Sequence, residues 1–106
     1  MANPFLAVPL ALHLIAASGG GVPTLDVRPS CLAAAKAQIT TTDRMQNCMA
    51  DEQSAHDQLV KAWRKFNAAD RATCVSAMLD FEPTYTEILT CLEMANDARK
   101  LPEDLY

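Results

Sequence analysis

The sequence predicts an all-α protein, a small bundle of about four helices stapled by two disulfides. Three observations point to this class. Apolar residues recur mostly at three- and four-residue steps after residue 30, the spacing of one face of a helix. Glycine is absent after Gly21, and no window alternates between apolar and polar residues as a strand does. The four cysteines are spaced symmetrically, with 16, 25 and 16 residues between successive ones.

The N-terminal region resembles an export signal. Residues 5–17 contain only apolar side chains plus Pro9 and His13, and Ser18 and three glycines follow. The run is shorter than the about 20 apolar residues that span a bilayer, and it ends in small residues, as secretory signals do. We therefore expect residues 1–18 to direct the protein to the periplasm or medium, with no membrane span in the mature chain. An uncleaved anchor or a misassigned start codon is the alternative.

The charge and size of the rest of the chain limit the classes of protein to which it can belong. Lys and Arg number 9 and Asp and Glu 13, so the formal charge is −4, and nucleic-acid binding is disfavoured. A chain this short has a marginal core, which disulfides commonly reinforce in an oxidising compartment. We expect an extended linker over residues 19–29, one helical domain over 30–101 and a tail over 102–106.

The first two helices are predicted from their starts. Ser30 offers a hydroxyl cap to the helix-forming run Cys31–Ala37, and the threonines at 40–42 favour its end. Asp43 with Gln46 then resembles a capping box. A long helix follows, ending near residue 66, and its apolar stripe comprises Met45, Cys48, Met49, Ala55, Leu59, Val60, Trp63 and Phe66.

The third helix is predicted to be shorter. Asn67, with Asp70 three residues later, caps it, and it extends to about Leu79. The sequence Phe81-Glu82-Pro83 breaks the helix, because proline disfavours helical backbone in the residue before it.

A second capping box, Thr84 with Glu87, opens the fourth helix. Arg99 and Lys100 suit its C-terminus, and Pro102 stops it. Its buried side is expected to carry Ile88, Cys91, Leu92 and Ala95.

Helix geometry selects one of the three pairings that four cysteines allow. Within each expected hairpin the two cysteines lie at nearly the same height, because the turn falls almost midway between them. Across the turn near Asn67, by contrast, Cys48 lies about 28 Å and Cys74 about 10 Å from the turn. We therefore predict two local disulfides, Cys31 with Cys48 and Cys74 with Cys91, each contributing roughly 3 kcal/mol.

Four stretches resemble small exported four-cysteine proteins of alphaproteobacteria with no assigned function: Cys48–Gln53, Asp57–Lys61, Ala69–Cys74 and Leu89–Ala95. This resemblance covers about Val22 to Pro102 and implies export. A weaker one, to the N-terminal domain of lysozyme-inhibitor lipoproteins, rests on Gln58, Trp63, Arg71 and Cys74. The spacing is wider than in that family and the lipobox is missing, so lysozyme inhibition stands as an alternative function.

One helical stripe could carry chemistry. Cys48, Glu52 and His56 recur every four residues, and thiolate, carboxylate and imidazole are all zinc or copper ligands. A metal- or redox-active module is therefore an alternative. We favour an oxidised Cys48 and a half-buried His56 partnered by Glu52, and predict no metal or cofactor. Without a C-x-x-C pair, a nucleophile elbow or a Gly-rich phosphate loop, we do not expect an enzyme.

A second cluster points to binding. Trp63, Arg64 and Phe66 lie beside the only local group of basic residues, and an aromatic side chain flanked by arginine is typical of binding hot spots. The competing interpretation places both rings in the core. Lys61 is expected to pair with Asp57 four residues earlier. Our leading hypothesis is a periplasmic or secreted protein that acts by binding a protein partner in the cell envelope.

Overall fold

The structure is a computed structural model that describes residues 21–37, 41–78 and 83–105. Over these ranges the chain forms four α-helices and no strand, which confirms the predicted fold class. None of the helices there is long and apolar enough to cross a membrane. The expected signal, Leu79 and most of the predicted breaker lie outside the described residues. The elements are α2 (Arg28–Lys36), α3 (Thr41–Ala62), the 3-10 turn η1 (Trp63–Lys65), α4 (Ala68–Met78), α5 (Tyr85–Arg99) and the 3-10 turn η2 (Glu103–Leu105).

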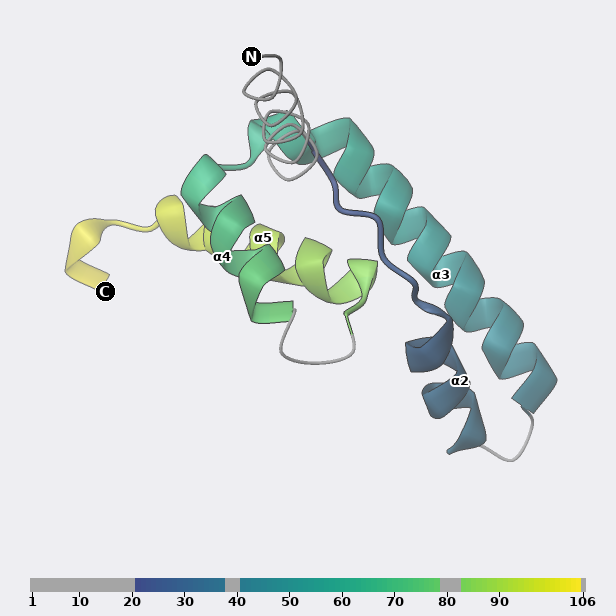
Figure 1. The fold of residues 1–106 in the computed structure, drawn as a ribbon. Coiled ribbons are helices and arrows are strands. Elements are labelled where there is room, and N and C mark those ends of the chain that lie inside the picture. The colour runs from purple at the N-terminus through teal and green to yellow at the C-terminus, as the bar shows by residue number, and fades with distance from the viewer. Residues whose placement is uncertain (1–20, 38–40, 79–82, 106) are drawn as a thin grey trace, which may run out of the picture.

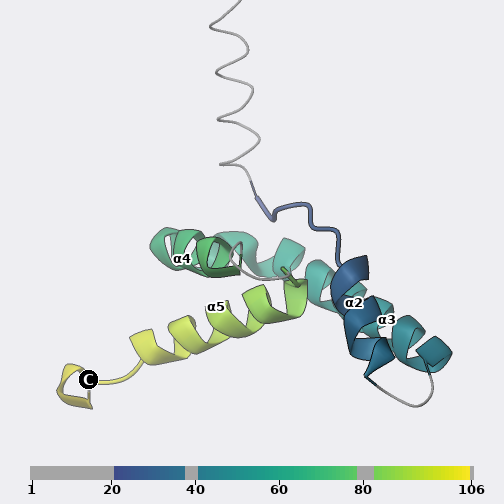
Figure 2. The same ribbon diagram turned by 60° about the horizontal axis from the view of Figure 1, so that its bottom comes forward.

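The helices form two pairs, the α2–α3 hairpin and the α4–α5 hairpin (Figure 1). Figure 2 shows these pairs as two arms set at an angle, with the N-terminal end of α5 reaching α3. Each hairpin is closed by its own disulfide. The Cα atoms are 5.5 Å apart in the Cys31–Cys48 pair and 5.7 Å apart in the Cys74–Cys91 pair. Both predicted pairings are confirmed, and together they use all four cysteines.

The core lies where α3 packs against α5. Leu59 of α3 and Ile88 and Leu92 of α5 are fully buried. Burying a side chain of this size contributes about 1.5–3 kcal/mol, so these three residues stabilise the core. The other buried members of the core are Val27, Ala55, Trp63, Cys74 and Tyr85.

Residues 21–27, here called the N-terminal strap, run along α3 on their way to α2 (Figure 1). An extended linker was expected over residues 19–29, but Arg28 and Pro29 belong to α2, and the strap that precedes them packs into the fold. Val27 is buried, and Val22 and Leu25 pack against the core. The strap is therefore part of the packed structure.

The start of α2 differs from the prediction. The helix begins at Arg28, with Pro29 in its first turn, where the missing N–H of proline is not needed. Ser30, predicted to be the cap, lies inside the helix, and its hydroxyl is buried with no hydrogen-bond partner among the described residues. The start of α2 is therefore determined by Pro29 and not by a cap from Ser30.

The caps of the last two helices agree with the prediction. Asn67 Oδ1 accepts the N–H of Ala69 at 2.8 Å, and Thr84 Oγ1 accepts the N–H of Glu87 at 3.1 Å. In both cases a side-chain oxygen satisfies a donor that the first helical turn leaves unpaired.

α3 differs from the prediction at both ends and at one position of its stripe. It begins at Thr41, so Asp43 lies in the first turn and is not the cap. The α-helix ends at Ala62, and the extended backbone of Phe66 (φ −79°, ψ 149°) follows η1. Val60, expected on the buried stripe, is 56% exposed.

Candidate functional site

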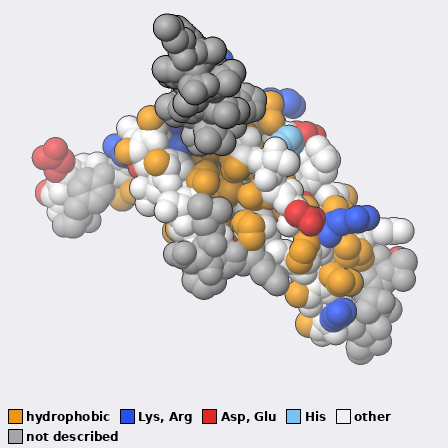
Figure 3. All heavy atoms as spheres, viewed as in Figure 1, with side chains coloured by type: hydrophobic (Ala, Val, Ile, Leu, Met, Phe, Trp, Pro, Cys, Tyr) orange, Lys and Arg blue, Asp and Glu red, His pale blue; other side chains and the backbone are white. Residues whose placement is uncertain are grey.

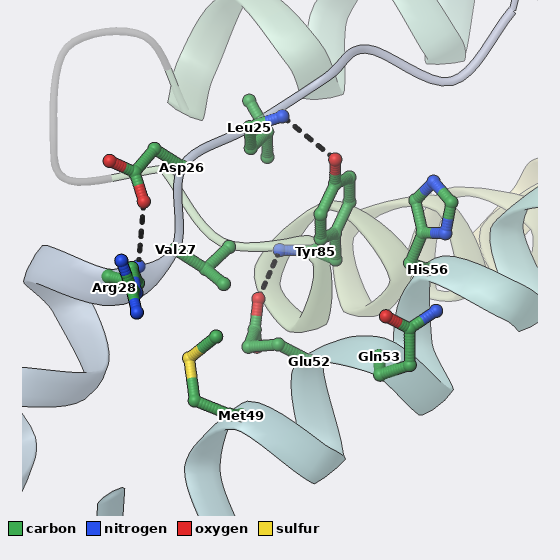
Figure 4. Close-up of a pocket in the computed structure, with 9 residues that line it drawn as sticks. All are labelled: Leu25, Asp26, Val27, Arg28, Met49, Glu52, Gln53, His56 and Tyr85. Atoms are coloured by element: carbon green, nitrogen blue, oxygen red, sulfur yellow. Dashed lines mark hydrogen bonds between the residues drawn. The ribbon is translucent and has the colours of Figure 1, made fainter.

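Glu52 is a buried acidic side chain placed by α3 against the start of α5. Only 5% of its surface is exposed. Oε1 accepts the backbone N–H of Tyr85 at 2.7 Å (Figure 4), and Oε2 accepts the backbone N–H of Thr86 at 3.4 Å as well as its hydroxyl. The first N–H groups of a helix lack partners within it, and the helix dipole favours an anion there. Glu52 therefore caps α5 from the other hairpin.

Tyr85 extends this network to the N-terminal strap. Its hydroxyl donates to the carbonyl of Pro23 at 2.9 Å and accepts the N–H of Leu25 at 2.8 Å. Its ring lies edge-on to His56, with the ring centroids 4.7 Å apart. One buried residue thus joins α3, α5 and the strap.

A cleft of about 330 Å³ lies beside this network, and Figure 4 shows strap and α3 side chains converging on Tyr85 there. Its polar groups are largely engaged. The oxygens of Glu52 accept three hydrogen bonds, and Asp26 accepts the N–H of Arg28 at 3.2 Å. None of the described residues that line the cleft is a Ser, Thr or Cys. It is lined by Leu25, Asp26, Val27, Arg28, Met49, Glu52, Gln53, His56 and Tyr85.

The proposed metal or redox stripe is not assembled as a ligand set. The sulfur of Cys48 is bonded to Cys31, so it supplies no thiolate. Glu52 faces the start of α5, and Nδ1 of half-buried His56 lies 3.8 Å from Asp57 Oδ1. His56 therefore contacts Asp57 and Tyr85, and not Glu52 as the favoured interpretation expected. No group of three metal-ligating side chains occurs within the described ranges.

A second hollow, here called the Val60 groove, has a volume of about 300 Å³ and lies where the strap meets the end of α3. Trp63 forms part of it and is 8% exposed, with the guanidinium carbon of Arg71 5.6 Å from the ring centroid. Val60 stands exposed beside this ring. The groove is lined by Gly21, Val22, His56, Val60, Lys61, Trp63 and Arg64.

The predicted binding residues fall into two groups. Trp63 and Arg64 both line the groove, whereas Phe66 packs half-buried against the core. Trp63 also belongs to the core, as the competing interpretation expected, and its role in binding stays a prediction. The exposure of Val60 was not predicted. Its hydrophobicity gave no signal, because a valine has the same side chain in the core and on the surface.

Positive charge gathers at the groove. Lys61, Arg64 and Lys65 are exposed, and none forms a hydrogen bond or ion pair with another described residue. The expected partner of Lys61, Asp57, instead accepts a hydrogen bond from Gln53 Nε2 at 3.0 Å. The nearby carboxylate of Asp70 is held by Arg99. The basic cluster thus keeps its charge available on a molecule that is acidic overall.

Asp70 and Arg99 form a two-point ion pair between α4 and α5. Arg99 Nε lies 2.6 Å from Oδ2 and Nη2 lies 2.9 Å from Oδ1. The hydrogen bond from Arg99 holds the pKa of the Asp70 carboxyl below its usual range, against a smaller opposing effect of burial. Planar, bidentate geometry of this kind fixes how the two helix ends meet.

The chain matches no protein-family model, no curated protein and no solved structure, so the geometry alone carries the argument for function.

Proposed function

We propose that this chain is an exported protein of the cell envelope that binds another protein through the Val60 groove. The observation that carries the proposal is the exposed Val60 side chain beside Trp63, flanked by cations that have no partner among the described residues. Tryptophan and arginine are enriched at the energetic centre of protein interfaces, and exposed apolar surface beside them adds area that a partner can bury.

The location in this proposal is supported by the disulfides. Two of them in a small protein are consistent with an oxidising, exported environment, since the cytosol keeps thiols reduced. The apolar run at residues 5–17 points the same way.

Lysozyme inhibition, an alternative function, has weaker support than partner binding through the Val60 groove. Cys74 is buried in a disulfide, and Arg71 stacks over the mostly buried Trp63. Gln58 lies exposed on α3, where its amide contacts Ser54. Trp63 and Cys74 are thus buried, whereas Gln58 is exposed, so the four residues do not form one exposed inhibitory surface. A lysozyme activity assay with the purified chain tests this alternative directly.

Site-specific photocross-linking in living cells tests the binding proposal. Val60 is replaced by p-benzoylphenylalanine in the full chain, and the matched control places the same group at Met94 of α5, which is 67% exposed. We expect a discrete cross-linked protein at position 60 that is missing at position 94 and is lost in the Lys61→Glu, Arg64→Glu background. No product at position 60, or the same products at both positions, overturns the proposal.

Fractionation of the same cells tests the location. We expect the chain in the periplasmic or secreted fraction with no thiols open to alkylation. Recovery in the cytosol with four reactive thiols contradicts export.

A further inference from the structure

We propose that the Val60 groove binds the acidic C-terminal segment Leu101–Leu105 of a second copy of this chain. This inference rests on the proposed function and deepens it by naming the partner. It joins two surface features of one sequence, a basic apolar groove and an acidic apolar tail.

The tail is presented without a partner of its own. α5 ends at Arg99, and Pro102 prevents the helix from continuing. Figures 1 and 2 both show η2 projecting away from the helices, and Figure 3 shows acidic side chains at this tip. Leu101 is 48% exposed, and neither Glu103 nor Asp104 forms a hydrogen bond or ion pair with a described residue. The segment offers carboxylates beside an apolar side chain in an accessible position.

The groove has the complementary chemistry. Lys61 and Arg64 can each meet one carboxylate of the tail, and exposed Val60 provides an apolar surface for a leucine. The molecule as a whole carries a formal charge of −4, and Lys61, Arg64 and Lys65 form a group of exposed cations at the groove. The basic cluster is therefore the favoured binding site for the acidic tail on the described surface.

The geometry of α5 favours a tail from another molecule. The two-point pair between Arg99 and Asp70 holds the end of α5 against α4, so the helix end cannot swing freely. The tail then leaves in a direction away from both arms (Figure 2). Because groove and tail are different surfaces, the contact is heterologous, and each molecule can donate one tail and accept one. A contact this small belongs with weak, transient interfaces, those burying less than about 1,200 Å².

Sedimentation of the full chain over a concentration series tests the inference. We expect self-association that weakens as salt rises. Lys61→Gln with Arg64→Gln, or Glu103→Gln with Asp104→Asn, weakens it roughly two- to thirtyfold, the range for two exposed ion pairs. Lys36→Gln with Arg44→Gln is the matched control, because it removes two exposed cations from the opposite end of the α2–α3 hairpin and leaves association unchanged.

A mixing experiment makes the test sharper. The groove variant keeps an intact tail and the tail variant keeps an intact groove, so the two together form a one-to-one dimer that grows no further. A wild-type chain that stays monomeric at every concentration overturns the inference, as does association that the four substitutions leave unchanged.

The outcome also separates this inference from the proposed function. A cross-link from position 60 to a different protein, with no self-association, removes the second copy as partner and leaves the groove as a binding site. A cross-linked product with twice the mass of the chain supports both.

Discussion

Glu52 accepts the backbone N–H of Tyr85 at 2.7 Å across 33 positions of sequence, and this bond joins the two hairpins. It places a carboxylate at the positive end of α5, where its oxygens accept hydrogen bonds from Tyr85 and Thr86. The residue most suggestive of chemistry in the sequence is therefore part of the structural framework.

Replacing Glu52 with alanine leaves the first N–H groups of α5 buried without an acceptor. We expect Glu52→Ala to lower the free energy of unfolding by about 2–3 kcal/mol and Glu52→Gln by about 1 kcal/mol, since the amide oxygen still accepts one bond. Urea denaturation followed by circular dichroism measures both. The control is Asp51→Ala, an exposed neighbour whose loss is expected to change stability by less than about 0.5 kcal/mol. Equal stability of the Glu52→Ala and Asp51→Ala variants contradicts the capping role.

Tyr85→Phe removes only the hydroxyl that holds the N-terminal strap. The N–H of Leu25 and the carbonyl of Pro23 then lose their partner, at a cost of about 1–2 kcal/mol. We expect the Leu25 amide to exchange with solvent faster, while amides at the disulfide in α4 keep their protection. Hydrogen exchange followed by NMR resolves the two. Unchanged protection at Leu25 argues against the hydroxyl contacts.

Asp70 gives stability a defined pH dependence. Its pKa in the folded chain lies below the usual value because of the hydrogen bond from Arg99, so its contribution is complete above the usual aspartate range and disappears as pH falls through the lowered pKa. We expect wild type and Asp70→Asn to differ most near neutral pH and to converge in strong acid. Asp97→Asn, at an exposed i, i+3 pair with Lys100, serves as control. A difference that persists unchanged in strong acid rules out this origin.

The two disulfides close loops of equal length, so their chain-entropy contributions are equal at roughly 3 kcal/mol. Cys74 also belongs to the main core, whereas Cys31 does not. We therefore expect replacing the Cys74–Cys91 pair by alanines to destabilise the chain more than replacing the Cys31–Cys48 pair. Chemical denaturation ranks the variants. Mass spectrometry of a non-reduced digest checks the pairing, and a peptide that joins Cys48 to Cys74 contradicts it.

The disulfide pairing was predictable because it depends on local geometry, namely helix rise and the position of a turn. The caps at Asn67 and Thr84 were predictable for the same reason, since each acts on a donor within three residues. Glu52 was not, because its donors lie in a helix whose docking on α3 no local pattern specifies. The exposure of Val60 also depends on which side of α3 receives α5 and the strap, and hydrophobic periodicity does not encode that choice.

The positions of the residues proposed to bind a partner were predictable in part. Trp63 and Arg64 line one groove because η1 follows directly on α3, whereas the extended backbone at Phe66 turns that ring toward the core. Nothing in the sequence indicated that Gly21 and Val22 line the groove. These residues are about 40 positions away from Lys61 and Trp63 along the chain, and only the tertiary fold brings the strap beside the end of α3.

Each disulfide joins two helices of the same arm, so it holds that arm together. No disulfide connects the two arms within the described residues, and the angle between them therefore depends on noncovalent packing. We therefore expect mild heating or dilute urea to separate the two arms while each arm remains helical. Trp63 should then become exposed to solvent before the helix content falls. Molecules opened in this way expose the apolar core residues of each rigid arm to solvent, and such exposed apolar surface promotes aggregation.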